Sequence, residues 1–506
     1  MLAVPSSDPS RRRGRGAVAI ARTAVLVSLL WAGALAPSRA VAAPDDDAAA
    51  VLAHARAVLG FAQASARVIH YRAVEAQDEA YQSDRSYPPF FSAMISEESW
   101  FDPATGVLRT SAQTTFPGGA PAPSVTLSDA GRGFAVGKEA LQPLPISALA
   151  ARYLNPRAVI ADWSAAGDVR SAGNEVYRDY VRRVLVRATP EGEQRLFLDP
   201  KAGVPIKLEL IVKHYLWGQR RLEYVYSNWM RAADILVPGA SFCLADGAIE
   251  RSQTVGEVDL VARAAAPSLA LPEQPVRSPD ELPRFLQPLD VTTTAVGPAT
   301  YLIANPGYTE AVTKVGDEVI VFDATQSEQR ARKDDEAIAR LFPGPHKITV
   351  VVTDLAWPHI AGVRYWVARG ATIVTHEAGR AFLRSVIDRR WTLAPDLLEQ
   401  RRKTVTPKLV GVTALTKLAG GAVSLHPIDG VGGETAVMAY LAADRFLWAS
   451  DFIQTVATPS LYADDVLAAV RRDGLHPERT AAEHLPLTPW SRVEALAGPA
   501  PAAAKP

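Results

Sequence analysis

The hydrophobic and polar positions of the C-terminal half predict strands that alternate with helices. An apolar run at residues 348–352 is followed by a polar loop at 353–359 and a helix-like stretch that opens near Ala361. A second apolar run, 371–375, follows a break at Gly370. This order of strand, loop, helix and strand predicts a parallel βαβ unit. Such units bind ligands in the loop beyond the carboxyl end of a strand, so the loop is the first candidate site.

The same reasoning predicts further elements on both sides of this unit. Short apolar runs bounded by turn residues predict strands, and longer stretches with helical spacing predict helices. The predicted strands are 300–303, 318–322, 436–441 and 446–449, and the predicted helices are 328–341 and 380–387.

The N-terminal half has a different pattern, in which apolar and polar residues alternate with period two. An Ala-rich helix is predicted at 49–66, and the strands that follow are predicted at 68–74, 98–109 (with a turn at 102–106), 180–188, 195–198, 207–217 and 220–229. Successive antiparallel hairpins make a sheet that needs a cover on its apolar face. We expect the helix at 49–66 to provide that cover.

The length of 506 residues exceeds one ordinary core and predicts two domains. Prolines crowd the segment 266–293, where they remove amide donors and stiffen the chain into a connector. We therefore predict a β domain at 49–265, a second domain at 294–497 and a disordered Ala/Pro-rich tail at 498–506. The fold class is α+β.

The first 42 residues have the layout of a secretory signal peptide. Five arginines between Arg11 and Arg22 precede an uncharged apolar run at 23–35, and Ala40-Val41-Ala42 forms a small-residue cleavage site. The apolar run is too short for a comfortable membrane span. An uncleaved anchor and a twin-arginine signal are the alternatives. We expect a periplasmic or secreted protein that has no stable membrane span after cleavage near Ala42.

Charge and cysteine content exclude some classes of function. Basic and acidic residues number 54 each, so no basic field favours nucleic-acid binding. Without residues 1–42 the balance becomes 48 basic and 53 acidic side chains. Cys243 is the single cysteine, which excludes an intramolecular disulfide and a thiolate metal cluster, and we expect it to be buried.

The loop at 353–359 reads Thr-Asp-Leu-Ala-Trp-Pro-His and is followed by Ala361-Gly362. It resembles the metal-binding loop of the metallo-β-lactamase superfamily, His-x-His-x-Asp-His before a glycine pair. The segments Y-L-I-A-N, V-G-D-E-V-I-V-F-D-A, 430–451 and 476–490 resemble the other parts of that family's domain in the same order. The resemblance implies a C-terminal αββα sandwich in which Asp323 ends a strand at the mouth of the site.

The metal ligands that this resemblance implies are only partly present. The first metal position would use Asp354, Ala356 and Gly432, and the last two have no donor atom. The second would use Pro358, His359, Asp451 and His484, of which three can bind a metal. The resemblance therefore implies one zinc ion at most, on His359, Asp451 and His484, with Asp354 as an added oxygen ligand. Asp354 and Asp451 are the candidate catalytic carboxylates.

Two other features bear on function. His426 could replace a missing ligand, but Pro427 and the strand end favour a histidine in a surface loop. The segment 197–229, with L-D-P-K-A-G and Y-S-N-W, resembles the curved sheet of periplasmic lipoprotein carriers. Three hypotheses follow: an exported scaffold or weakly active homologue with a degraded dinuclear site, a mononuclear hydrolase of ester, thioester or lactam bonds, and a carrier of lipid-like ligands. Neither the substrate nor the oligomeric state follows from the sequence.

Overall fold

The computed structural model describes residues 47–82, 90, 92–116, 121–129, 132–278, 290–428, 430 and 435–496. The predicted signal peptide, the predicted tail at 498–506 and Gly432 lie outside these residues, as does most of the second half of the predicted linker. Among the helices of the described part, none combines the length and apolar character needed to span a bilayer.

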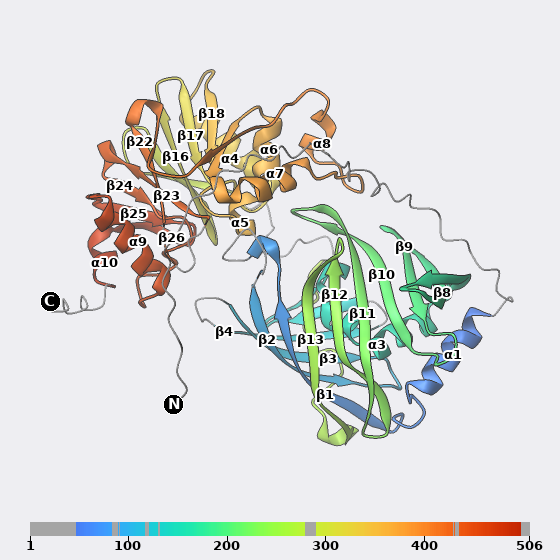
Figure 1. The fold of residues 1–506 in the computed structure, drawn as a ribbon. Helices are drawn as coiled ribbons and strands as arrows, with labels where there is room; N and C mark the ends of the chain where they lie inside the picture. Colours follow the sequence, from blue (N-terminus) through green and yellow to red (C-terminus); the bar gives the residue numbers. More distant parts are fainter. Residues whose placement is uncertain are drawn as a thin grey trace, which may run out of the picture. The chain divides into compact units, whose positions relative to one another are not determined.

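Within the described residues, the N-terminal half forms one antiparallel sheet of 13 strands (Figure 1). Their order is β6-β5-β4-β3-β2-β1-β13-β12-β11-β10-β9-β8-β7, so two meanders meet where β1 pairs with β13. The strands are β1 (Arg67–Gln77), β2 (Ala93–Phe101), β3 (Leu108–Thr115), β4 (Pro121–Asp129), β5 (Arg132–Val136), β6 (Leu141–Pro143), β7 (Arg170–Tyr177), β8 (Tyr180–Thr189), β9 (Gly192–Leu198), β10 (Pro205–His214), β11 (Gly218–Ala232), β12 (Ile235–Ala245) and β13 (Ala248–Ala262). The predicted hairpins of β2 with β3 and of β10 with β11 are confirmed.

Three helices share a core with one face of this sheet: α1 (Ala48–Val58), α2 (Ala150–Leu154) and α3 (Pro156–Ala165). Leu52 of α1 and Trp163 of α3 pack in the same cluster as Leu208 and Tyr224 of the sheet. The predicted helix at 49–66 is too long, because Gly60 adopts a φ of +76° that ends the helical path. Helices α2 and α3, which the sequence pattern missed, share the covering role.

The C-terminal half contains two further sheets. One has the order β14-β15-β16-β17-β18-β19-β20 and the other β21-β22-β23-β24-β25-β26. The first comprises β14 (Thr292–Ala295), β15 (Thr300–Asn305), β16 (Tyr308–Val315), β17 (Glu318–Phe322), β18 (Lys347–Val351), β19 (Thr372–His376) and β20 (Lys408–Val412). The second comprises β21 (Thr416–Leu418), β22 (Val423–Pro427), β23 (Val437–Leu441), β24 (Phe446–Trp448), β25 (Arg479–Ala482) and β26 (Leu485–Pro489).

The two sheets pack face to face, and helices cover their outer faces (Figure 1). Between the sheets, Phe322 and Val351 of the first meet Leu425, Val437 and Trp448 of the second. Residues of α4 (Glu328–Leu341), α6 (Val363–Ala368), α7 (Arg380–Asp388) and α8 (Leu397–Arg401) pack on the first sheet, and those of α9 (Leu461–Arg472) and α10 (Trp490–Glu494) on the second. The layers are therefore helix, sheet, sheet and helix.

The predicted βαβ unit is present around the candidate loop. Strands β18 and β19 pair in parallel, and α5 (Trp357–Ile360) and α6 lie between them in the chain. The predicted bounds of α4 and β17 agree with the structure, and Ser327 caps α4 by accepting from Arg330 N. Cys243 is buried in β12, as expected. The carboxyl ends of β17 and β18 meet at one edge of the sheet, which positions the site.

Candidate metal centre

Asp323, the residue that follows β17, links the strand ends around the site. Its carboxylate accepts hydrogen bonds from Thr353 N (2.8 Å) and Thr353 Oγ1 (2.7 Å) beyond β18, and from Trp448 Nε1 (3.0 Å) in the other sheet. Asp323 is fully buried and has a φ of +81°, which a residue with a Cβ rarely adopts. Such strain persists only where its surroundings fix it, and it concentrates at functional sites.

The loop after β18 places His359 beside this carboxylate. Pro358 lies in the first turn of α5, where a missing N–H does no harm. Backbone hydrogen bonds from Ala324 N to His359 O (2.9 Å) and from Gly362 N to Ala324 O (2.7 Å) fasten the loop to the segment after β17. The fully buried His359 ring has Nδ1 3.1 Å from Asp323 Oδ2 and Nε2 3.4 Å from Glu483 Oε2. Asp323 therefore orients the ring so that Nε2 faces Glu483.

Glu483 and Asp451 come from the second sheet. Glu483 lies in the turn between β25 and β26, and its backbone bonds to Ser450 O (3.0 Å) and to Thr309 N (2.8 Å) hold it there. Asp451 follows Ser450 just beyond β24. One ligand atom from each of His359, Asp451 and Glu483 lies within 4.8 Å of the others, so these three side chains form the centre of the site.

The structure also places the remaining predicted ligands near this centre. His484 Nε2 lies 3.8 Å from Asp451 Oδ1 and 3.6 Å from Glu483 Oε2. Its Nδ1 lies 2.7 Å from the carbonyl oxygen of Gly307, which can only accept, so Nδ1 carries the proton and Nε2 presents a lone pair in the neutral ring. Asp354 is half-buried, accepts from Ala356 N (2.6 Å) and acts electrostatically on His359 and Asp451. The four predicted residues thus surround the same region as Glu483.

Sequence reasoning missed Glu483 because the resemblance implies a histidine, His484, in this segment and no carboxylate beside it. The pairing of β25 with β26 changes register between Thr480 and Ala482, and Glu483 falls in the tight turn that follows. From this turn, the side chains of Glu483 and His484 both approach the carboxylate of Asp451. The one available signal was an acidic residue directly beside a predicted ligand.

His426 does not belong to this centre. It lies within β22 rather than in a surface loop, and only 3% of its surface is exposed. The prediction of a surface histidine was wrong because Asp473 and Ser424 satisfy both ring nitrogens in a buried position.

The centre contains buried polar atoms that the protein itself does not satisfy. Among the described residues, both carboxylate oxygens of Glu483, Oδ1 of Asp451 and both ring nitrogens of His359 have no well-directed hydrogen bond, although Nδ1 of His359 is close to Asp323. Buried polar atoms are almost always paired, and each unpaired group needs an explanation. A cation between these atoms would satisfy them.

The electrostatics of the centre favour a positive ligand. Burial raises the pKa of Glu483 well above its usual range, and the carboxylates of Asp451, Asp323 and Asp354 raise it further. Burial also raises the pKa of Asp451 and of Asp354. Burial alone would lower the pKa of His359, but Glu483 and Asp323 raise it well above its usual value. A divalent cation would offset the negative charge of these buried carboxylates and so oppose the rise of their pKa values.

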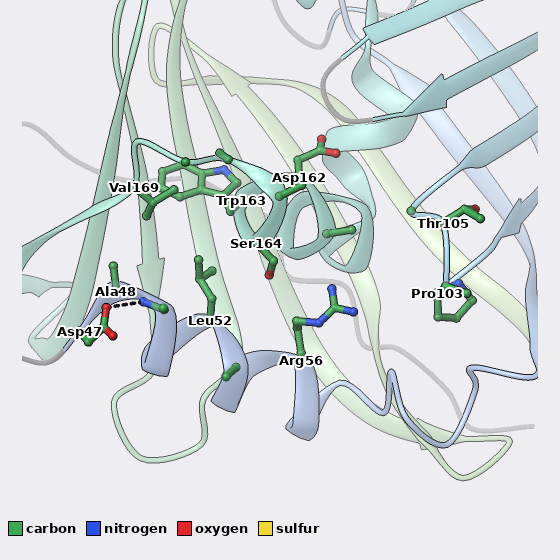
Figure 2. A pocket seen from close by; sticks show the side chains of 18 residues that line it. Asp47, Ala48, Leu52, Arg56, Pro103, Thr105, Asp162, Trp163, Ser164 and Val169 are labelled. Carbon is green, nitrogen blue, oxygen red and sulfur yellow. Dashed lines mark hydrogen bonds between the residues drawn. The ribbon is translucent and has the colours of Figure 1, made fainter.

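A cavity of about 630 Å³ lies elsewhere, between α1 and α3 (Figure 2). Leu52 and Arg56 of α1 and Trp163 of α3 line it. Its charged groups already have partners, because Asp162 pairs with the buried Arg152, Asp47 accepts from Ala49 N, and the Arg56 guanidinium lies 4.1 Å from the centre of the Phe61 ring. The cavity could therefore accommodate a ligand, but the side chains that could bind a metal lie in the metal centre.

No family model matches the sequence, and no curated protein matches it. Solved structures that resemble it include DIM-1 metallo-β-lactamase (11% identity, TM-score 0.33, covering 41% of this chain and 95% of that chain). They also include FIM-1 from Pseudomonas aeruginosa in the mono-zinc form (12%, 0.33, 41% and 93%) and a metallo-β-lactamase from Pontibacter korlensis (12%, 0.32, 40% and 96%). The structural neighbours of the chain are therefore metallo-β-lactamases, and the chemistry of its own centre follows from its own residues.

Proposed function

We propose that the C-terminal half is a metallo-β-lactamase-like domain that binds one divalent cation and uses it to hydrolyse an ester, thioester or lactam. The observation that carries this proposal is the convergence of His359, Asp451 and Glu483 on one point, with buried atoms that have no well-directed hydrogen bond among the described residues. The dinuclear site of the family is reduced here to a mononuclear one.

The donor set fits a single divalent cation. An imidazole nitrogen and two carboxylates are a ligand combination found for zinc and for iron, and zinc is the ion that we expect. Asp323 would orient the His359 ring through the ring nitrogen that does not bind the metal. Metal-bound histidines commonly have a carboxylate in this position. Ala356 and Pro358 have no side-chain donor where the resemblance places ligands, so a second cation has too few partners.

The residues around the centre suit hydrolysis. When bound, a divalent cation lowers the pKa of a water molecule and polarises a carbonyl group. Asp354 is the nearby carboxylate that we assign as general base, since burial raises its pKa towards the range in which a base works best. Asp451 and Glu483 hold the negative charge that the cation needs, and His484 at the exposed edge contacts substrate.

The setting that we propose is outside the cytoplasm, in the periplasm or as a secreted protein. The cationic region, the apolar run and the small-residue cleavage site of residues 1–42 support this location.

Metal analysis of protein purified without chelator tests the proposal. We expect about one equivalent of zinc or a similar divalent ion, and hydrolysis of a chromogenic ester or lactam that a chelator abolishes and the same ion restores. Protein that contains no metal and takes up none on titration would contradict the proposal. A metal-free scaffold would then be the correct description of the domain.

The pKa shifts predict how stabilisation by the metal depends on pH. In the metal-free folded protein, Glu483, Asp451, Asp354 and His359 have raised pKa values, so stability is lost as pH rises through those values. A bound cation replaces the protons and removes this loss. The increase in Tm on adding metal should therefore be larger at about pH 8 than at about pH 5.5, with protons released on binding. Calorimetric scans at both pH values check this, and an increase that is equal or larger at the lower pH would contradict it.

A further inference from the structure

A second group of reactive side chains lies on the outer face of the six-stranded sheet. His426 Nδ1 lies 2.9 Å from Asp473 Oδ2, and His426 Nε2 lies 2.8 Å from Ser424 Oγ. A carboxylate only accepts, so Nδ1 carries the proton and Nε2 accepts the hydroxyl hydrogen of Ser424. The alternative acceptor of that hydrogen, Tyr440 O, is farther away at 3.4 Å. A hydroxyl, an imidazole and a carboxylate are thus linked in the order that activates a serine nucleophile.

The strand pattern explains how these residues come together. Val423 and Leu425 of β22 point into the core between the two sheets, so Ser424 and His426 share the opposite face. Helix α9 crosses that face and ends at Asp473, its C-terminal capping residue. The Arg472 guanidinium fixes the carboxylate by bonding both of its oxygens at 2.8 Å, and it also donates to Pro427 O (2.8 Å).

The charge states match the roles. Burial lowers the pKa of His426, and Asp473 only partly opposes this, so the ring is neutral and able to accept a proton at neutral pH. Hydrogen bonds from Arg472 lower the pKa of Asp473, so that carboxylate stays ionised. His426 is buried, whereas Ser424 is partly open to solvent.

A lysine lies opposite Ser424 on the neighbouring strand. In the pairing of β21 with β22, Lys417 is directly opposite Ser424, so the two side chains leave the sheet on the same face. Lys417 is exposed and carries a positive charge on this face of the sheet. The group therefore contains a nucleophile, a base, a residue that orients the base, and a cation.

We propose that Ser424, His426 and Asp473 form a second reactive site that accepts an acyl group from a small activated ester. Ser424 Oγ forms a bond to the carbonyl carbon while its proton moves to His426 Nε2. The bond from that carbon to the leaving oxygen then breaks, and the proton on Nε2 passes to the leaving alkoxide. A water molecule then attacks the acyl carbon while its proton moves to His426 Nε2. The bond to Ser424 Oγ breaks, and that proton returns to Ser424 Oγ. The site shares no residue with the metal centre and goes beyond the function proposed for that centre.

Labelling with diisopropyl fluorophosphate, followed by peptide mass mapping, tests the proposal. In this reaction Ser424 Oγ forms a bond to phosphorus, fluoride leaves and the proton passes to His426. We expect one adduct, on Ser424, in the full chain and in the presence of chelator. Asp473→Asn should slow labelling by about 100-fold or more, because the ring loses the carboxylate that fixes its proton. Ser385→Ala, at an exposed serine of α7, should label like wild type.

The labelling results in chelator distinguish this site from the metal centre. Labelling that persists in chelator while metal-dependent hydrolysis is lost supports a site that works independently. Absence of an adduct on wild-type protein, an adduct on another residue, or wild-type labelling of Asp473→Asn overturns the proposal. Ser424→Ala, a small change at a partly open position, should retain the wild-type Tm and lose the adduct, which excludes misfolding as the cause.

Discussion

Replacing Glu483 by glutamine is expected to weaken cation binding by more than about 100-fold. Mutating a residue that only hydrogen-bonds to a metal ligand already lowers metal affinity by about 10- to 100-fold, and Glu483 is proposed as a ligand itself. The amide has nearly the same shape as the carboxylate but no charge, and it leaves the centre with His359 and Asp451 as its metal-binding side chains. Titration against a competing fluorescent chelator measures the change in affinity. The variant should still fold, because loss of a charge that has no well-directed hydrogen bond relieves repulsion among the carboxylates.

Glu478→Gln is the matched control for this prediction. Glu478 lies five positions earlier in the chain and pairs with Arg445 at the exposed surface. Its replacement should leave metal affinity unchanged. Equal affinities of wild-type protein and Glu483→Gln would show that Glu483 is not a ligand and would return the site to the ligands proposed from sequence, His359, Asp451 and His484.

Replacing Asp323 by alanine is expected to lower the free energy of unfolding by about 3–5 kcal/mol, the range for removing one partner of a buried charged pair. Alanine leaves Thr353 N and Trp448 Nε1 without their acceptor, leaves Thr353 Oγ1 with Ser450 Oγ as its acceptor, and leaves His359 without its nearest carboxylate. It also removes one of the links between the two sheets, the one from the end of β18 to β24. Chemical denaturation in chelator measures the loss without any contribution from metal.

Two further variants show whether the effect is specific. Asp388→Ala removes an exposed carboxylate that pairs with Arg384, and a surface pair of this kind contributes at most about 1 kcal/mol. Asp323→Asn keeps one oxygen acceptor and should recover part of the stability. It should not restore tight metal binding, because the negative charge next to His359 Nδ1 is lost. Similar losses for Asp323→Ala and Asp388→Ala would contradict the linking role of Asp323.

Local patterns predicted much of the C-terminal half. Apolar runs separated by turns gave β17, β18 and β19, and helical spacing gave α4, because in these segments local preference and burial agree. The N-terminal half was less predictable. Its sheet pairs β1 with β13, whose paired residues lie from 174 (Gln77 and Arg251) to 195 (Arg67 and Ala262) positions apart in the chain, and no local pattern reports such a pairing. The likeness of 197–229 to periplasmic lipoprotein carriers stays a prediction.

The candidate site was predictable at positions where the resemblance implies a ligand, and it was missed at Glu483, where the resemblance implies none. Asp323, Asp354 and His359 follow the ends of parallel strands, and topology alone brings such positions to one edge of a sheet. Glu483 lies in the same turn between β25 and β26 as the predicted His484, but the resemblance implies only a histidine there. His426 was misplaced because its partner Asp473 lies 47 residues away, at the end of a helix. The one signal for the group around Ser424 was the spacing of serine and histidine on one strand face.

Anomalous diffraction from crystals grown with zinc tests most directly the claim that one cation is held by His359, Asp451 and Glu483. We expect a single peak at about 2.0–2.2 Å from His359 Nε2 and from one oxygen of each carboxylate. Two peaks about 3.5–4 Å apart, as in a two-metal site, would contradict the account, and so would no peak at a zinc concentration well above that needed for binding.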